Sequence, residues 1–205
     1  RHGTLMIADE VATGFGRTGT MFACEQAGIS PDIMCLAKGL TAGYLPLAAT
    51  LASETVFAAF SGAYSEYRTL FHGHTYGGNP LGCAAAIANL DVFEREGTVA
   101  AARECGDLFD KLLDEHITPL AHSGPPRRIG MMAAFDILRD PDAGLAYATD
   151  ERRGNRAVLE ARKEGVIIRP LGDTMVLMPP LNIPAELLGH MVETTAQATS
   201  RATAD

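Results

Sequence analysis

The sequence predicts an α/β layered domain with a largely parallel sheet, followed by a smaller α+β unit. Short apolar runs alternate with helical stretches in the first part of the chain, which is typical of βαβ units. After a turn-rich stretch at 123–126, the pattern changes to a strand, a helix, a hairpin and a final helix. The 205 residues suffice for one large domain or two small ones, and we expect domains at 1–120 and 121–205.

Three short apolar runs are expected to form the strands of the first sheet, at 5–8, 33–37 and 47–51. The first run ends in Asp9-Glu10 and leads into a glycine-rich loop at 14–19. The second run ends at Lys38-Gly39. Charged side chains therefore stand where two of the predicted strands end.

Four helices are predicted in the first part of the chain, at 22–27, 53–60, 79–96 and 98–117. Ser53 and the pair Asn79-Pro80 are favourable helix starts, and Gly28 and Gly97 are favourable stops. A polar and aromatic loop at 61–78 separates the second helix from the third. Loops of this length are often functional.

The second part is predicted to contain a strand at 129–137 and a helix at 151–164 that Gly165 closes. A hairpin follows, with strands at 166–169 and 174–178 and a turn at 171–173. A final helix begins at Pro184.

Composition and charge exclude several classes of protein. The chain is 47% hydrophobic, and no apolar run approaches the ~20 residues that a bilayer requires. Its formal net charge of -8 and the lack of a basic stripe argue against nucleic acid as a partner. The four cysteines form no CxxC pair, which argues against a zinc site and a disulfide framework, so we expect a cytoplasmic protein.

The stretch from Gly14 to Gly19 matches the dinucleotide fingerprint G-x-G-x-x-G, which would indicate an NAD-dependent oxidoreductase. Two observations disfavour that interpretation. Asp9 and Glu10 stand at the strand end, where they would repel a pyrophosphate, and the next strand ends in Lys38 rather than in the acidic residue that binds the ribose. The oxidoreductase stays a minor alternative.

Asp9 and Lys38 lie 29 residues apart, which is about one βαβ step. Both are therefore expected at the carboxyl edge of the sheet. A carboxylate and an amine at such an edge suit pyridoxal phosphate, whose aldehyde joins a lysine and whose ring nitrogen pairs with an acid. A buried salt bridge and two solvated side chains are the structural alternatives for this pair.

Several motifs, in order along the chain, resemble those of the class III pyridoxal-phosphate aminotransferases. They are IADEVATGFGRTG at 7–19, PDIMCLAKGL at 31–40, GYLPLAAT at 43–50, HGHTY at 72–76, NPLGCA at 79–84 and GVIIRPLG at 165–172. The similarity runs from about residue 5 to residue 183. It implies part of a fold type I large domain, followed by a small C-terminal domain, and pyridoxal 5'-phosphate as cofactor.

Within the family, these motifs are most similar to those of the members that act in biotin synthesis. The resemblance then implies S-adenosylmethionine, or lysine, as amino donor, 8-amino-7-oxononanoate as acceptor and 7,8-diaminononanoate as product. Another ω-amino-acid aminotransferase of the same class is the main alternative. A non-catalytic interaction domain is a third, which no amphipathic or low-complexity segment of the sequence favours.

The resemblance assigns roles to individual residues. Lys38 is implied to form the Schiff base with the cofactor, Asp9 to pair with the pyridinium nitrogen and Val11 to pack on the ring face. Thr75 corresponds to the threonine that binds the cofactor phosphate of the neighbouring subunit, with His74 beside it also binding cofactor. A homodimer with shared sites is therefore expected.

Arg169 and Gly73 are assigned to substrate binding by the same resemblance. Arg169 precedes Pro170 at the tip of a short predicted strand, where a guanidinium can bind a carboxylate through two hydrogen bonds. A surface ion pair is the alternative role for this arginine. His72 and His74 form an H-x-H pair without a nearby Asp, Glu or Cys, so we expect no metal site.

The chain opens with Arg1-His2-Gly3-Thr4, without an initiator Met or a targeting segment, and a strand-like run follows at once. Family members contribute a phosphate cup and ring-stacking aromatic residues from a segment that precedes the position of Asp9. We therefore expect this sequence to be the C-terminal portion of the enzyme and to be inactive in isolation.

Overall fold

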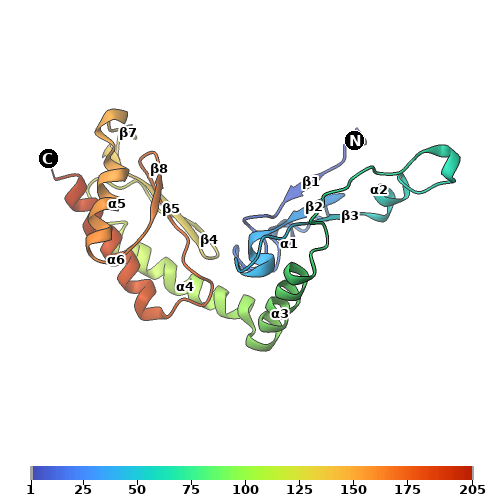
Figure 1. Ribbon diagram of the computed structural model, residues 1–205. Coiled ribbons are helices and arrows are strands. Elements are labelled where there is room, and N and C mark those ends of the chain that lie inside the picture. The colour runs from blue at the N-terminus through green and yellow to red at the C-terminus, as the bar shows by residue number, and fades with distance from the viewer. Residues whose placement is uncertain (1, 205) are drawn as a thin grey trace. The chain divides into compact units, whose positions relative to one another are not determined.

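The computed structural model describes residues 2–204 and divides into two compact units (Figure 1). The first unit ends at Val99 and the second begins at Ala100. The domain boundary that we expect near residue 120 stays a prediction. No helix within residues 2–204 combines the length and the apolar character that crossing a bilayer requires.

The first unit contains a three-stranded sheet in the order β1-β2-β3. Its strands are β1 (Ile7–Asp9), β2 (Ile33–Leu36) and β3 (Ala49–Ala52). β1 and β2 are parallel, with Asp9 opposite Cys35, whereas β2 and β3 are antiparallel. The prediction of a largely parallel sheet is therefore correct for the first pair and wrong for the second, because the connection at residues 37–48 contains only a 3-10 turn and loop. A crossover to a parallel strand usually runs through an α-helix that packs on the sheet, and this connection has no such helix.

The helices of the first unit begin and end close to the predicted positions. They are α1 (Ala23–Ala27), α2 (Glu54–Ala58) and α3 (Pro80–Glu96). Ser53 caps α2 by accepting a hydrogen bond from the Val56 N–H, and Asn79 caps α3 by accepting from the Leu81 N–H. Gly97 ends α3 in the left-handed conformation that glycine tolerates best.

The core of the first unit lies on one face of the sheet, around the buried ring of Phe15. Phe22 and Phe93 meet that ring edge to face, at 5.7 Å and 6.4 Å between ring centroids. Leu36 of β2 and Ala86 of α3 complete the contact between sheet and helix. Phe15 thus joins the glycine-rich loop, β2 and α3.

The second unit contains a four-stranded antiparallel sheet in the order β4-β5-β9-β8 and a small two-stranded sheet. The strands are β4 (Arg127–Ile129), β5 (Met132–Asp136), β6 (Leu138–Asp140), β7 (Leu145–Ala146), β8 (Arg169–Leu171) and β9 (Thr174–Leu177). The strand predicted at 129–137 is confirmed for β5, but its first residues belong to β4 and to the turn between the two strands. Gly130 adopts a positive φ of 56° there and turns the chain into the β4-β5 hairpin.

Three helices belong mainly to the second unit: α4 (Thr98–His116), α5 (Arg153–Lys163) and α6 (Ala185–Ala202). α5 and α6 lie side by side in Figure 1 and make the most extensive contact between any two elements. Phe109 of α4, Phe135 of β5 and Leu188 of α6 are fully buried in one core. The α+β character predicted for this part of the chain is confirmed.

The hairpin of β8 and β9 is fastened to the start of α5. Asp173, in the turn of the hairpin, accepts a hydrogen bond from the Gly154 N–H at 2.7 Å. Gly154 lies so close to the Gly172 carbonyl that a Cβ atom would not fit there. The predicted hairpin is confirmed, although its first strand starts at Arg169 and not at Val166.

Candidate functional site

Asp9 and Lys38 stand at the same edge of the first sheet. Asp9 is the last residue of β1, and Lys38 follows the end of β2 by two residues. Because β1 and β2 are parallel and Asp9 lies opposite Cys35, the carboxyl ends of both strands meet at this edge. The placement predicted from the spacing of the two residues is confirmed.

The turn after β1 orients the Asp9 carboxylate. Its Oδ1 accepts a hydrogen bond from the Val11 N–H at 3.0 Å, and the side chain is exposed. Within residues 2–204, neither Asp9 nor Lys38 forms an ion pair. The buried salt bridge that was one alternative for this pair is therefore not formed, and both groups are accessible to a ligand.

Glu10, the next residue, has a structural role. It is 2% exposed, and its carboxylate accepts hydrogen bonds from the Thr13 hydroxyl and from the Cys24 N–H, the latter at 2.8 Å. Burial by itself raises the pKa of Glu10, but these hydrogen bonds outweigh it and hold the pKa below its usual value. The buried anion thus ties the end of β1 to the start of α1, and Asp9 alone remains available at the strand end.

The glycine-rich stretch does not have the geometry of a dinucleotide-binding turn. The Gly14 N–H donates to the Glu10 carbonyl at 2.9 Å, so the chain folds back on the strand end. The next helix, α1, begins only at Ala23, four residues after Gly19. In the dinucleotide fingerprint the glycines themselves open the helix that faces the pyrophosphate. The structure therefore argues against the oxidoreductase alternative.

Lys38 has an unusual backbone conformation. Its φ is +44°, in the left-handed region that residues with a side chain rarely adopt, and it begins the 3-10 turn η1 (Lys38–Thr41). The Lys38 side chain is exposed. Two neighbours support the turn. Phe15 packs against Gly39, and the Asn89 side chain of α3 donates hydrogen bonds to the carbonyls of Gly39 and Leu40.

Asn89 was not predicted as a functional residue. The sequence signal for it is modest, since it is a polar residue on the half-buried face of a helix that is otherwise rich in alanine.

Gly73, His74 and Thr75 lie in the loop between α2 and α3, and all three are exposed. The His74 Nδ1 accepts a hydrogen bond from the Tyr76 N–H at 3.2 Å, and the His74 carbonyl accepts from the Gly77 N–H at 2.9 Å. No hydrogen bond within residues 2–204 involves the Thr75 hydroxyl. The same range contains no cluster of three His, Cys, Asp or Glu side chains able to hold a metal ion.

Arg169 belongs to the second unit, whereas Asp9, Val11, Lys38 and the 73–75 loop belong to the first. It begins β8 and lies opposite Val176 of β9. Its side chain is exposed and forms no ion pair with any acidic residue of the described part of the chain. A surface ion pair, the alternative role for this arginine, is therefore not observed.

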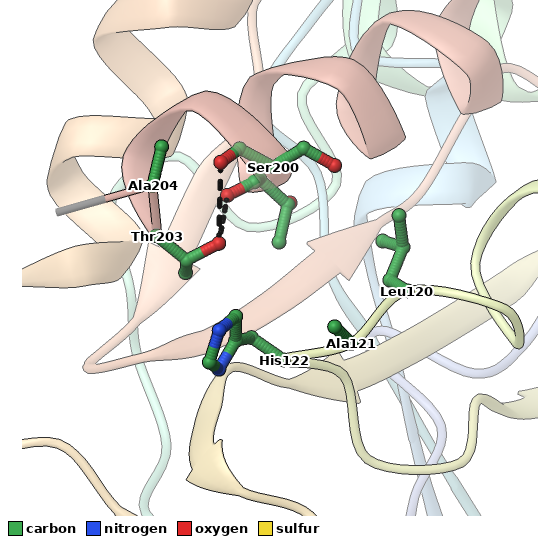
Figure 2. A pocket seen from close by; sticks show the side chains of 7 residues that line it. Leu120, Ala121, His122, Ser200, Thr203 and Ala204 are labelled. Carbon is green, nitrogen blue, oxygen red and sulfur yellow. Dashed lines mark hydrogen bonds between the residues drawn. The ribbon is translucent and has the colours of Figure 1, made fainter.

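A pocket of about 330 Å³ lies in the second unit, between the segment after α4 and the end of α6 (Figure 2). The side chains of His122, Thr199 and Thr203 in its lining already form hydrogen bonds within the protein. Thr203 donates to the carbonyls of Thr199 and Ser200, and the His122 ring contacts the Leu138 carbonyl and the Tyr147 hydroxyl. None of the residues assigned to cofactor or substrate lines it.

Comparisons with known proteins agree with the motifs. The model of the family described as Aminotransferase class-III matches residues 1–199. The adenosylmethionine-8-amino-7-oxononanoate aminotransferase of Nitratidesulfovibrio vulgaris is 54% identical over 97% of this chain and 36% of its own length. The enzyme of the same name from Geobacter sulfurreducens is 52% identical over 94% of the chain and 42% of its own length. The chain thus spans about two fifths of the curated relatives that it matches.

Solved structures give the same result. The crystal structure of adenosylmethionine-8-amino-7-oxononanoate aminotransferase from Methanocaldococcus jannaschii superposes with a TM-score of 0.92 at 38% identity, over 97% of this chain and 46% of that one. An amine transaminase from an uncultivated Pseudomonas species, solved in its PLP-bound form, also has a TM-score of 0.92, at 39% identity over 98% of this chain and 46% of its own.

Proposed function

Because the chain belongs to the class-III aminotransferase family, we propose that the intact protein transfers an amino group from S-adenosylmethionine to 8-amino-7-oxononanoate, giving 7,8-diaminononanoate for biotin synthesis. The chain has the mixed α/β fold of the class-III transaminases, as the sequence predicted. The observation that carries the proposal is the juxtaposition of Asp9 and Lys38 at one sheet edge, in a chain 54% identical to a relative that bears this enzyme's name.

The residues at this edge fit pyridoxal 5'-phosphate. An acidic side chain and an amine stand at the ends of two adjacent parallel strands, and neither is neutralised by an ion pair among the described residues. The carboxylate of Glu10, the other acid at this edge, is buried and already accepts hydrogen bonds within the protein. When bound, the cofactor supplies an aldehyde that joins an amine and a ring that withdraws electrons.

Lys38 and Asp9 divide the chemistry between them. The Lys38 Nζ would hold the cofactor, and it would be the general base for the α-carbon proton of the amino donor, a role that suits a lysine. The Asp9 carboxylate, which the Val11 N–H orients, holds a proton on the ring nitrogen of the cofactor. Val11 would pack against the face of that ring.

The loop before α3 completes the cofactor site of a neighbouring subunit in a homodimer. Thr75 binds the cofactor phosphate, and His74 lies beside it in the same exposed stretch. The support for this role is the accessible Thr75 hydroxyl, which has no hydrogen-bond partner among residues 2–204. The homodimer is part of this proposal.

Arg169 and Gly73 bind substrate. S-adenosylmethionine and 8-amino-7-oxononanoate both carry a carboxylate, and a guanidinium fork binds such a group through two charge-assisted hydrogen bonds. The exposed Arg169 side chain has no competing acidic partner in the described chain. We place the reaction in the cytoplasm, since all four cysteines are unpaired.

Borohydride trapping tests the proposal directly. The intact protein is loaded with pyridoxal phosphate, reduced and digested, and the peptides are analysed by mass spectrometry. We expect a pyridoxyl group on Lys38, its loss in Lys38→Ala and its retention in Lys111→Ala, a control at an exposed lysine of α4. An intact protein without label on Lys38 contradicts the aminotransferase function.

The second candidate function is that of another ω-amino-acid aminotransferase, which the amine transaminase among the structural matches favours. A screen of amino donors separates the two. We expect turnover of 8-amino-7-oxononanoate with S-adenosylmethionine or lysine as donor. Turnover confined to other ω-amino acids and other acceptors supports the second function.

A further inference from the structure

The 3-10 turn that follows Lys38 is held from a distant part of the chain. The Asn89 Nδ2 donates to the Gly39 carbonyl at 2.8 Å and to the Leu40 carbonyl at 3.2 Å. Asn89 is half-buried on α3, fifty residues further along the chain from Gly39. These contacts join α3 to the backbone directly beside Lys38.

The Lys38 backbone needs such support. A φ of +44° places the lysine in a region where its Cβ crowds the following carbonyl group. Strained conformations of this kind persist only where the surrounding structure holds them, and they cluster at functional sites.

The turn is fixed by apolar and polar contacts together. Phe15 fills the space beside Gly39, and Leu40 and Thr41 are buried. The Thr41 hydroxyl donates to the Leu45 carbonyl at 2.6 Å, which closes the turn from the side that follows it. Asn89 supplies the polar contact from α3, and its carboxamide has the two N–H donors that binding both carbonyls requires.

We propose that Asn89 is a positioning residue for Lys38, an inference that rests on the proposed function. By holding the Gly39 and Leu40 carbonyls, its side chain keeps the Lys38 backbone in the left-handed conformation and so sets the direction in which the lysine leaves the sheet edge. Asn89 acts through the turn and contacts neither cofactor nor substrate. Its loss is therefore expected to impair the reactions of Lys38 more than the affinity for substrate.

Two variants test this role in the intact protein. Asn89→Ala removes the carboxamide, and Asn89→Asp keeps its shape but has no N–H donor, so it carries the test if the alanine variant fails to fold. Asp91→Ala, at an exposed position of the same helix, is the matched control. The readouts are amide hydrogen exchange of the peptide that contains residues 38–42, the rate at which pyridoxal phosphate becomes reducible onto Lys38, and kcat and KM.

In both Asn89 variants we expect faster exchange at residues 38–42. We also expect the labelling rate of Lys38 and kcat to fall on the order of tenfold or more, since a small misplacement of a reacting group is costly. KM for the acceptor and all values for Asp91→Ala stay near those of the unaltered protein.

Three results contradict the inference. Normal labelling and kcat in the Asn89 variants, with only a lower melting temperature, reduce Asn89 to a packing role. Unchanged exchange at residues 38–42 shows that Asn89 does not hold the turn. An unaltered protein without label on Lys38 overturns the proposed function itself and the role of Asn89 with it.

Discussion

Phe15 lies against Gly39 so closely that position 39 has no space for a side chain. A Cβ atom added to Gly39 would lie 2.8 Å from the Cβ of Phe15. The Phe15 Cβ is next to the backbone of the glycine-rich loop and cannot move away as the tip of a flexible side chain could. A glycine at position 39 is therefore required by close packing as well as by the turn that follows Lys38.

Gly39→Ala is expected to destabilise the first unit by about 1–3 kcal/mol, the usual cost of forcing extra volume into a packed site. The measurement is denaturant unfolding followed by far-UV circular dichroism. Gly189→Ala in α6 is the control, because nothing lies within 4 Å of a Cβ atom added there. It should be neutral or stabilising, by about 0.5–1 kcal/mol. Equal stability of both variants contradicts the close packing of Phe15 on Gly39.

Asp9→Asn should lower kcat by roughly 10² or more, because a preorganised charge that acts on the reacting system is lost. Asparagine still accepts the hydrogen bond that the Val11 N–H donates, so the turn after β1 should survive. We expect unchanged circular dichroism and continued trapping of the cofactor on Lys38. A kcat within a few-fold of that of the unaltered protein contradicts the role assigned to Asp9.

Glu10→Gln is expected to be less stable than the unaltered protein at pH 7, by about 1–3 kcal/mol, because N–H donors then face an amide instead of a carboxylate. The pKa of Glu10 is lower in the folded protein than the value of about 4.3 for an unfolded chain. The charged form therefore contributes stability above that value and loses it as the pH falls through the folded pKa.

The difference between Glu10→Gln and the unaltered protein should accordingly shrink below about pH 4.3. Urea unfolding of both proteins between pH 3 and pH 7 measures this difference in the free energy of unfolding. Glu94→Gln, at an exposed position of α3, serves as the comparison and should track the unaltered protein at every pH. A difference for Glu10→Gln that does not vary with pH argues against an ionised, hydrogen-bonded Glu10.

Arg169→Ala should raise KM for substrates that carry a carboxylate, by about tenfold to a hundredfold, because a charge-assisted hydrogen bond contributes about 1.5–3 kcal/mol. Arg169→Lys should recover only part of this loss, since lysine lacks the planar fork. Steady-state kinetics measures the effect. The control is Arg162→Ala, which replaces an exposed arginine of α5. An unaltered KM in Arg169→Ala assigns the carboxylate to another residue.

Asp173→Ala should destabilise the second unit by about 1–3 kcal/mol, because the Gly154 N–H loses its charged hydrogen-bond acceptor. Asp173 accepts from the Gly154 N–H and so fastens the hairpin that carries Arg169 to the start of α5. Thermal unfolding measures the loss, with Asp142→Ala in the exposed β6-β7 turn as the control. Equal melting temperatures for the two variants contradict a stabilising role of the hydrogen bond between Gly154 and Asp173.

The sequence predicted most helices and strands of this fold because their ends carry local signals. Ser53, Asn79 and Gly97 mark helix ends through contacts with residues a few positions away, and the structure confirms each of them. The strand predicted at 129–137 is right for β5, but it starts too early, since the isolated Gly130 between Ile129 and Met131 gives only a weak local signal of a turn. The antiparallel direction of β3 depends on strand pairing, which no local pattern specifies.

By itself the sequence determined which residues could carry the chemistry of this protein: Asp9 and Lys38 one βαβ step apart, within motifs that identify the family. Only the tertiary structure decided how that lysine is held, because the contacts that support it come from residues far away in the chain. Phe15, which precedes both α1 and β2 in the chain, packs against Gly39. Asn89 of α3 donates a hydrogen bond to the same turn. Hydrogen bonds and close packing depend on distances in space, and these distances are set when β2 and α3 come together around the Phe15 ring.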